Sequence, residues 1–236
     1  MAAKLDAEDI AYWYLRLNGF LILRNFLVHG DRRGETRTDI DVLGVRFRYR
    51  REHLDQPMKD DDWIAQTNRT IVVFCEAKKR ADDFNPAWTK RDKMTMESFL
   101  ALVGVIPRKL WPHVANELYE AGRSEVNQEA LITTLLINHD PERRVSTRLK
   151  LAQHIQLEHA LRFIHRRFKK YHSVKTPHGQ WEPSGHAIWN LYSSFRSSED
   201  RFVNLVMDRI GIPQTRSADL NTLHPSDHRE AVDKIG

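Results

Sequence analysis

The chain has only one cysteine, no internal repeat and no long apolar segment among its 236 residues. A single cysteine, Cys75, excludes an internal disulfide framework. The longest apolar run, from Phe99 to Ile106, is far shorter than the roughly 20 residues that a transmembrane helix needs. The N-terminal stretch MAAKLDAEDIAYW carries charges where a secretory signal needs an apolar segment. We therefore expect a soluble, cytoplasmic protein.

Positive charge is distributed unevenly along the chain. The 37 Lys and Arg residues outnumber the 32 Asp and Glu residues, and the pI is near 9.3. Residues 1–100 are nearly balanced, with 18 basic and 17 acidic residues, whereas residues 143–175 hold ten Lys or Arg and a single acid, Glu158. A stretch of this kind favours contacts with nucleic-acid phosphates, which release counterions when they are neutralised. A solvated helix face is the alternative interpretation.

The hydrophobic pattern predicts a mixed α/β core with the element order α-β-β-β-α-β over residues 1–138. Gly19 is expected to end the first helix. Five successive apolar residues before Glu76 indicate a central strand that is buried on both faces. The expected elements are a helix over 6–18, strands over 20–28, 38–47 and 69–78, helical stretches over 86–102 and 111–121, and a strand over 130–138.

Helices are expected after residue 138. A long amphipathic helix is predicted over 145–170, followed by helices near 185–196 and 199–210. The chain would thus divide into a core (1–140), a basic helical extension packed on it (141–212) and an extended tail (213–236). The residues of the long helix that we expect to contact nucleic acid are Arg148, Arg162, Arg166, Lys169 and Lys170.

The strand predicted over 38–47 carries two acidic residues. Period-two alternation places Asp39 and Asp41 on one side of the strand, and Ile40 and Val42 on the other. The next predicted strand ends in the sequence EAK, at residues 76–78.

Glu76 and Lys78 are two residues apart, so their side chains project from the same face of the strand. A carboxylate buried at this position without a partner would be costly, and a cation shared with an aspartate of the neighbouring strand, such as Asp41, would compensate it. Two carboxylates suit Mg²⁺, which can neutralise phosphate charge and activate water, and an ammonium group can stabilise the transition state. The set indicates metal-assisted cleavage of phosphodiesters. A structural salt bridge of Lys78 with Asp41 or Glu76 remains the alternative.

The sequence TDID at residues 38–41, followed by EAK at residues 76–78, resembles the PD-(D/E)xK nuclease superfamily. That superfamily has the restriction-endonuclease-like fold, whose core order is α-β-β-β-α-β. The stretch over residues 7–26 is similar to the first helix and strand of archaeal-type Holliday junction resolvases and their bacterial relatives. The resemblance covers roughly residues 5–138 and names no family for the C-terminal helices.

The resemblance implies roles for individual residues. Asp41 and Glu76 would be metal ligands, the main-chain carbonyl of Ala77 a third ligand, and Lys78 the residue that serves the attacking water. Glu8 would be an acid of the first helix that approaches the metal.

Asp39 competes with Asp41 for the metal, and Asp41 is preferred because the sequence VLGV continues the strand after it. The implied activity is an Mg²⁺-dependent nuclease, more an endonuclease than an exonuclease, with Mn²⁺ as a substitute metal and DNA favoured over RNA. Repair, recombination or defence against mobile elements would be its setting, and a homodimer would supply two sites for two strands. The alternative is a catalytically silent nucleic-acid-binding module, or a subunit that needs a partner.

Overall fold

The two strands with the most continuous apolar sequence lie side by side at the centre of a mixed sheet. β3 (Thr70–Lys78) and β5 (Ala130–Asn138) run parallel, and side chains on both faces of these strands are buried. The computed structural model describes residues 4–29, 36–55, 57–80, 83–142, 149–176 and 181–213. In these residues the chain is an α/β protein with C-terminal helices, as the sequence predicts.

The sheet has six strands in the described residues, in the order β1-β2-β3-β5-β4, with β6 also beside β5. The β1–β2, β2–β3 and β4–β5 pairs are antiparallel, whereas β3–β5 and β5–β6 are parallel. β4 and β6 share one edge of β5, because β4 pairs with residues 130–133 and β6 with residues 135–138. The other strands are β1 (Leu21–His29), β2 (Thr36–Arg46), β4 (Arg123–Val126) and β6 (Gln153–Gln156).

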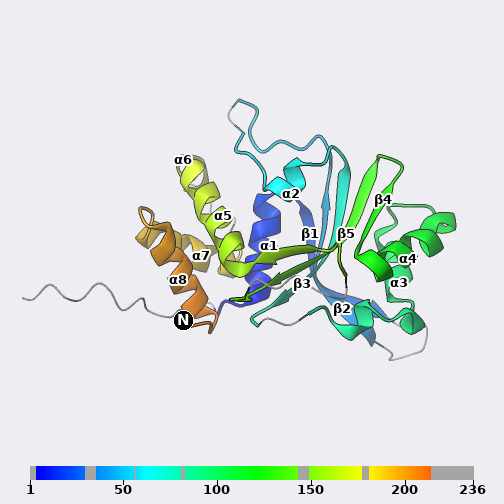
Figure 1. Cartoon of the computed structure of the whole chain (residues 1–236). Coiled ribbons are helices and arrows are strands. Elements are labelled where there is room, and N and C mark those ends of the chain that lie inside the picture. The colour runs from blue at the N-terminus through cyan, green and yellow to red at the C-terminus, as the bar shows by residue number, and fades with distance from the viewer. Residues whose placement is uncertain are drawn as a thin grey trace, which may run out of the picture.

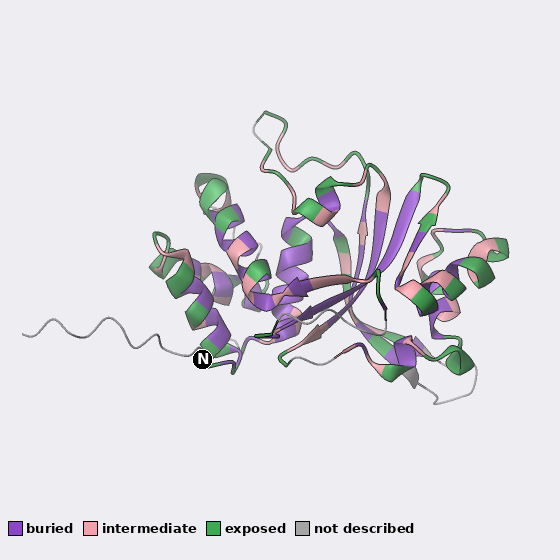
Figure 2. Ribbon diagram, viewed as in Figure 1, coloured by how far each residue is buried: buried purple, intermediate pink, exposed green. Residues whose placement is uncertain are grey.

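Helices cover both faces of the sheet in two separate groups (Figure 1). α1, α5, α7 and α8 share one hydrophobic cluster with the sheet, and α3 and α4 share a second cluster on the opposite face. Figure 2 shows the buried residues concentrated in the strands and on the helix sides that face them. The helices are α1 (Ala7–Leu17), α2 (Asp62–Ala65), α3 (Thr95–Val103), α4 (Trp111–Ala121), α5 (Leu157–Lys170), α6 (His172–Lys175), α7 (Pro183–Ser194) and α8 (Glu199–Arg209). No helix in this part of the chain combines the length and the apolar character needed to cross a bilayer.

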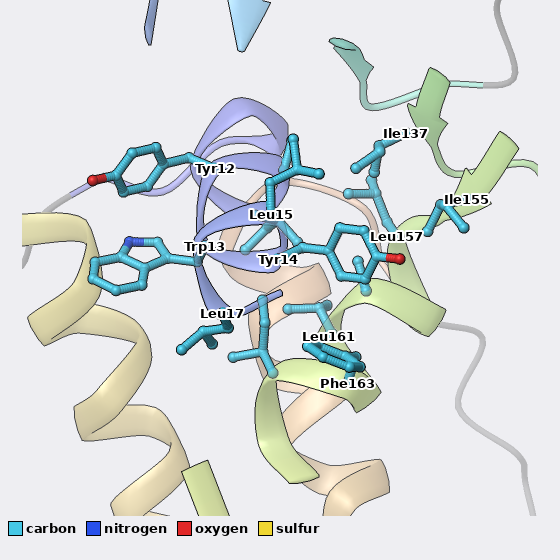
Figure 3. Close-up of a cluster of buried hydrophobic side chains, with 14 of the residues drawn as sticks. Tyr12, Trp13, Tyr14, Leu15, Leu17, Ile137, Ile155, Leu157, Leu161 and Phe163 are labelled. Carbon is cyan, nitrogen blue, oxygen red and sulfur yellow. The ribbon is translucent and has the colours of Figure 1, made fainter. Parts of the chain in front are cut away.

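Helix α1 is fixed at both ends and packs against α5. It begins after Asp6, whose side chain accepts a hydrogen bond from the main-chain N–H of Asp9 in a capping box, and Gly19 follows its end at φ +84°. Figure 3 shows side chains of α1 and α5 meeting between the two helices. The rings of Tyr14 and Phe163 lie there edge to face, with centroids 5.4 Å apart.

The four predicted strands are confirmed to within two residues, and so are the helices over 6–18, 111–121, 185–196 and 199–210. The sequence did not predict β4 or β6. The helix predicted over 86–102 is only partly right, because two 3₁₀ turns (Pro86–Trp88 and Arg91–Lys93) precede α3. Met94, at φ +49°, separates the second turn from the helix.

The prediction of one helix over 145–170 is wrong in its first part. Residues 153–156 form β6, which extends the sheet by pairing with β5, and α5 starts only at Leu157. Main-chain pairing with β5 and burial of Ile155 explain why these residues form a strand. The sequence could not show it, because four residues are too few to display a strand period. Residues 143–148, and almost all of the predicted tail over 213–236, lie outside the described residues.

The long connection between β2 and β3 is held to α5 by a buried arginine. The Arg167 side chain is 0% exposed, and its guanidinium donates to Glu52 Oε2 at 2.9 Å and to Asp60 Oδ1 at 3.2 Å. Lys175 also contacts Glu52, at 3.0 Å. The connection is therefore packed on the helical layer through charged contacts.

Replacing Arg167 with alanine should lower the free energy of unfolding by about 2–3 kcal/mol, because a fully buried side chain and its hydrogen bonds to Glu52 and Asp60 are lost, although both carboxylates keep other cations. Arg166→Ala is the matched control, since the Arg166 side chain is 60% exposed and pairs only at the surface. Its cost should stay within about 1 kcal/mol. Urea denaturation of both variants measures the difference, and equal losses would contradict a structural role for the buried pair.

Candidate active site

The candidate site lies where β2 and β3 stop pairing. The pairing runs from Arg46 and Ile71 to Val42 and Cys75, so Asp41 and Glu76 come next on the two strands. At this point the Asp41 carboxylate accepts a hydrogen bond from the main-chain N–H of Ala77, at 2.8 Å. A side chain thus takes the position of a main-chain partner at the end of the ladder.

A change of strand face coincides with Asp41. Ile40 and Val42 were expected on one side of β2, but they lie in the two opposite hydrophobic clusters, so this expectation is wrong. Asn25 of β1 explains the change. It lies between the strand partners of Val42 and Ile40 and has a left-handed backbone, at φ +49°. Such a conformation is uncommon outside glycine, and Asn is one of the residues that tolerate it.

Glu76 and Lys78 of β3 contact each other, as their spacing predicts. Lys78 Nζ lies 3.3 Å from Glu76 Oε1 and donates to the main-chain carbonyl of Asp83 at 2.7 Å. The other carboxylate oxygen of Glu76 accepts from the main-chain N–H of Asn85 at 2.7 Å. The loop after β3 therefore orients both side chains, and only 8% of Glu76 is exposed.

Helix α1 brings a third carboxylate close to Asp41. Burial, together with the charges of Asp41 and Asp6, raises the pKa of Glu8 to about 7, and the charge of Arg24 offsets part of this rise. Arg24 itself donates to Asp9 at 2.9 Å. The helix acid expected from the sequence is thus near Asp41 of β2.

Negative charge is in excess at this edge of the sheet. Burial raises the pKa of Asp41 and of Glu76, and each group is influenced by further carboxylates, namely Asp39 for Asp41 and Asp41 for Glu76. Lys78 acts in the opposite direction on both. Asp39 is exposed, so it contributes charge but is less enclosed than Asp41.

The donor set suits a hard cation. Carboxylate and carbonyl oxygens with water are the ligands that Mg²⁺ prefers, and an added cation would offset the repulsion that raises these pKa values. No cluster of three or more His, Cys, Asp or Glu side chains arranged to hold a metal occurs in the described ranges. A metal at this site would therefore rely on Asp41 and Glu76 together with the Ala77 carbonyl and water.

Two of the basic residues expected to bind nucleic acid are paired with an acid of the neighbouring helix α8. Arg162 and Arg166 of α5 form ion pairs with Glu199 of α8, at 3.1 and 2.9 Å, while Lys169 and Lys170 are exposed. Arg148 lies outside the described residues. Nucleic-acid binding by this helix stays a prediction.

Three positioning residues have no signal of their own in the sequence. The main-chain carbonyl of Asp83 accepts a hydrogen bond from Lys78, and Asn25 has a left-handed backbone opposite Asp41. The charge of Arg24 lowers the pKa of Glu8. Asn85 holds Glu76 through its main-chain N–H. Main-chain atoms carry two of these contacts, and residue type does not reveal main-chain contacts.

No family model, curated protein or solved structure matches the chain.

Glu8→Gln should stabilise the metal-free protein above pH 7. The pKa of Glu8 rises from 4.5 to about 7 on folding, so the folded state binds more protons, and stability is lost as the pH rises through this window. The gain in free energy of unfolding in EDTA should be largest above pH 7 and absent below pH 4.5.

Urea denaturation of wild type and variant at several pH values gives this difference. The difference is the informative quantity, because other groups also titrate; burial lowers the pKa of His154, for example. Glu129→Gln, in the exposed turn before β5, is the matched control and should show no such dependence. A Glu8→Gln difference that is independent of pH would contradict the assigned environment.

Proposed function

We propose that the chain is an Mg²⁺-dependent nuclease that hydrolyses phosphodiester bonds of DNA, with a site of the PD-(D/E)xK type. The observation that carries the proposal is the grouping of Asp41, Glu76 and Lys78 at the ends of two adjacent strands, with Glu8 of α1 near Asp41. The α/β core supports it further, because α1, β1, β2, β3, α3 and β5 follow the order of that superfamily, with α4 and β4 inserted before β5.

Different residues of the site would bind the metal and orient its ligands. Asp41, Glu76 and the Ala77 carbonyl would hold the metal, and hydrogen bonds from Ala77 N–H and Asn85 N–H fix the two carboxylates. When bound, Mg²⁺ supplies positive charge at the phosphate and lowers the pKa of a coordinated water.

Lys78 and Glu8 are suited to the proton and charge changes of hydrolysis. The Lys78 ammonium is held between Glu76 and the Asp83 carbonyl, so it presents a fixed positive charge where negative charge develops on the phosphate. A carboxyl group with a pKa near 7 can exchange a proton at neutral pH, which fits Glu8 as a general acid or base.

A catalytically silent nucleic-acid-binding module is the second candidate. It is favoured by the fact that Asp41, Glu76 and Lys78 each have a partner within the chain, as in a structural cluster. The excess of negative charge around Glu8 favours the nuclease, since a purely structural cluster would be expected to balance its charges.

Lys78→Ala should reduce DNA cleavage by about 10²–10³-fold, the usual cost of losing one group that stabilises transition-state charge. The assay follows labelled plasmid, linear and branched DNA and an RNA of the same sequence, with Mg²⁺, Mn²⁺ or EDTA. Lys79→Ala is the matched control, because Lys79 is the next residue and is exposed.

The nuclease proposal predicts metal-dependent cutting that Lys79→Ala retains and Lys78→Ala loses. If folded wild-type protein cuts no nucleic acid with either metal but still binds DNA, the silent module is the better account. Equal losses in the two lysine variants would remove the specific role of Lys78.

A further inference from the structure

A polar cavity lies near the candidate active site, at the same edge of the sheet. A cavity of about 630 Å³ opens at the carboxyl ends of β5 and β6 and at the start of α5. A space of this size with a few converging polar groups is typical of a small-molecule subsite. The polar residues that matter most in its lining are His139, Asp140, His154, Gln156 and Glu158.

The strand register places this cavity close to Lys78. Lys78 pairs with Asn138 across β3 and β5, and Asn138 pairs with Gln156 across β5 and β6. Neighbouring strands are about 4.8 Å apart, so β6 lies roughly 10 Å from β3. Asp83, whose carbonyl holds Lys78, is near enough to His154 for its charge to influence the pKa of that imidazole.

Hydrogen bonds fix the orientation of two of the three imidazoles in the lining. His154 Nε2 lies 2.6 Å from the Asn138 side-chain oxygen, and His139 Nδ1 lies 2.6 Å from Glu158 Oε1. Since both partners are oxygen acceptors, these two ring nitrogens carry hydrogen. Burial lowers the pKa of His154, so its ring is neutral at pH 7 and its Nδ1 is an acceptor.

The basic side chains of the lining are already paired, so they offer little to a phosphate. Arg162 pairs with Glu199 at 3.1 Å, and His159 pairs with Asp61 at 2.6 Å. Asp140 and Glu158 contribute two carboxylates, and one oxygen of Glu158 is engaged by His139. A neutral heterocycle with amino groups fits better, because carboxylates accept hydrogen bonds from exocyclic amines and imidazoles stack on bases.

We infer that this cavity binds a nucleobase, that of a nucleotide next to the scissile phosphate. A base reaches such a cavity only when it is unpaired, so the substrate would be single-stranded DNA or a duplex from which one nucleotide is turned out. The substrate assignment rests on the proposed nuclease function, whereas binding of the base by itself does not.

Titration of the metal-free protein with nucleoside 5′-monophosphates tests the cavity directly. Calorimetry with dAMP, dCMP, dGMP and dTMP should show binding that favours the three amino-bearing bases, and 2-deoxyribose 5-phosphate should not bind. Glu158→Ala should weaken binding of the amino-bearing nucleotides at least tenfold, about 1.4 kcal/mol. Glu129→Ala, at the opposite end of β5, should bind as wild type does.

Three results would overturn the inference. In the first, deoxyribose phosphate binds as tightly as the nucleotides do. In the second, the folded wild-type protein binds no nucleotide, and in the third, Glu158→Ala binds nucleotides as tightly as wild type does. Thermal unfolding of Glu158→Ala verifies that the variant is folded, and Asp140→Asn gives a second, isosteric change in the same lining.

Cleavage assays separate this inference from the nuclease proposal. Preference for single-stranded over fully paired DNA, reduced in Glu158→Ala, supports the substrate assignment. Equal cutting of both substrates, unaffected by Glu158→Ala, removes that assignment and leaves the nuclease proposal intact. If no nucleic acid is cut, the nuclease proposal fails, and nucleotide titration alone decides whether the cavity is a base site.

Discussion

The parallel pairing of β3 with β5 is the constraint on which the rest of the structure depends. Both strands are almost wholly buried and run in one register from Thr70 and Ala130 to Lys78 and Asn138. Parallel strands that start together also end together, so the polar residues after both strands collect at one edge of the sheet. Ligands of open α/β sheets commonly bind at this edge. The carboxylate cluster lies there beside β3, and the cavity lies there beside β5 and β6.

Charge at that edge explains why a cation is the natural complement of the cluster. Asp41, Glu76 and Glu8 have raised pKa values, because burial and mutual repulsion both disfavour their ionised forms. Lys78 offsets only part of this charge. Buried carboxylates that repel one another lower the free energy of unfolding, and destabilising clusters of this kind are typical of functional sites.

The sequence predicts the parts of the fold that have a strong local pattern. β3 is evident from five successive apolar residues, and α1 from its spacing and from Gly19. The contact of Glu76 with Lys78 was predicted from the same-face geometry of a strand, and the hydrogen bond of Asp41 to Ala77 agrees with the adjacent strands expected.

Features set by tertiary contacts were beyond the sequence. β6 has four residues, and only its pairing with β5 makes it a strand, so His154 was placed on a helix and the cavity stayed hidden. Arg167 belonged to a basic stretch that suggested a solvated or phosphate-binding surface, but it is fully buried against Glu52, 115 positions away. The left-handed backbone of Asn25 has no pattern in composition or periodicity.

A crystal structure grown with Mn²⁺ would locate a divalent cation between the strand ends. We expect a single strong anomalous peak with oxygens of Asp41, Glu76 and the Ala77 carbonyl at about 2.1–2.2 Å, the range of hard divalent cations. No peak at this position in crystals that contain Mn²⁺, with Lys78 still paired to Glu76, would show that the strand ends do not form a metal site.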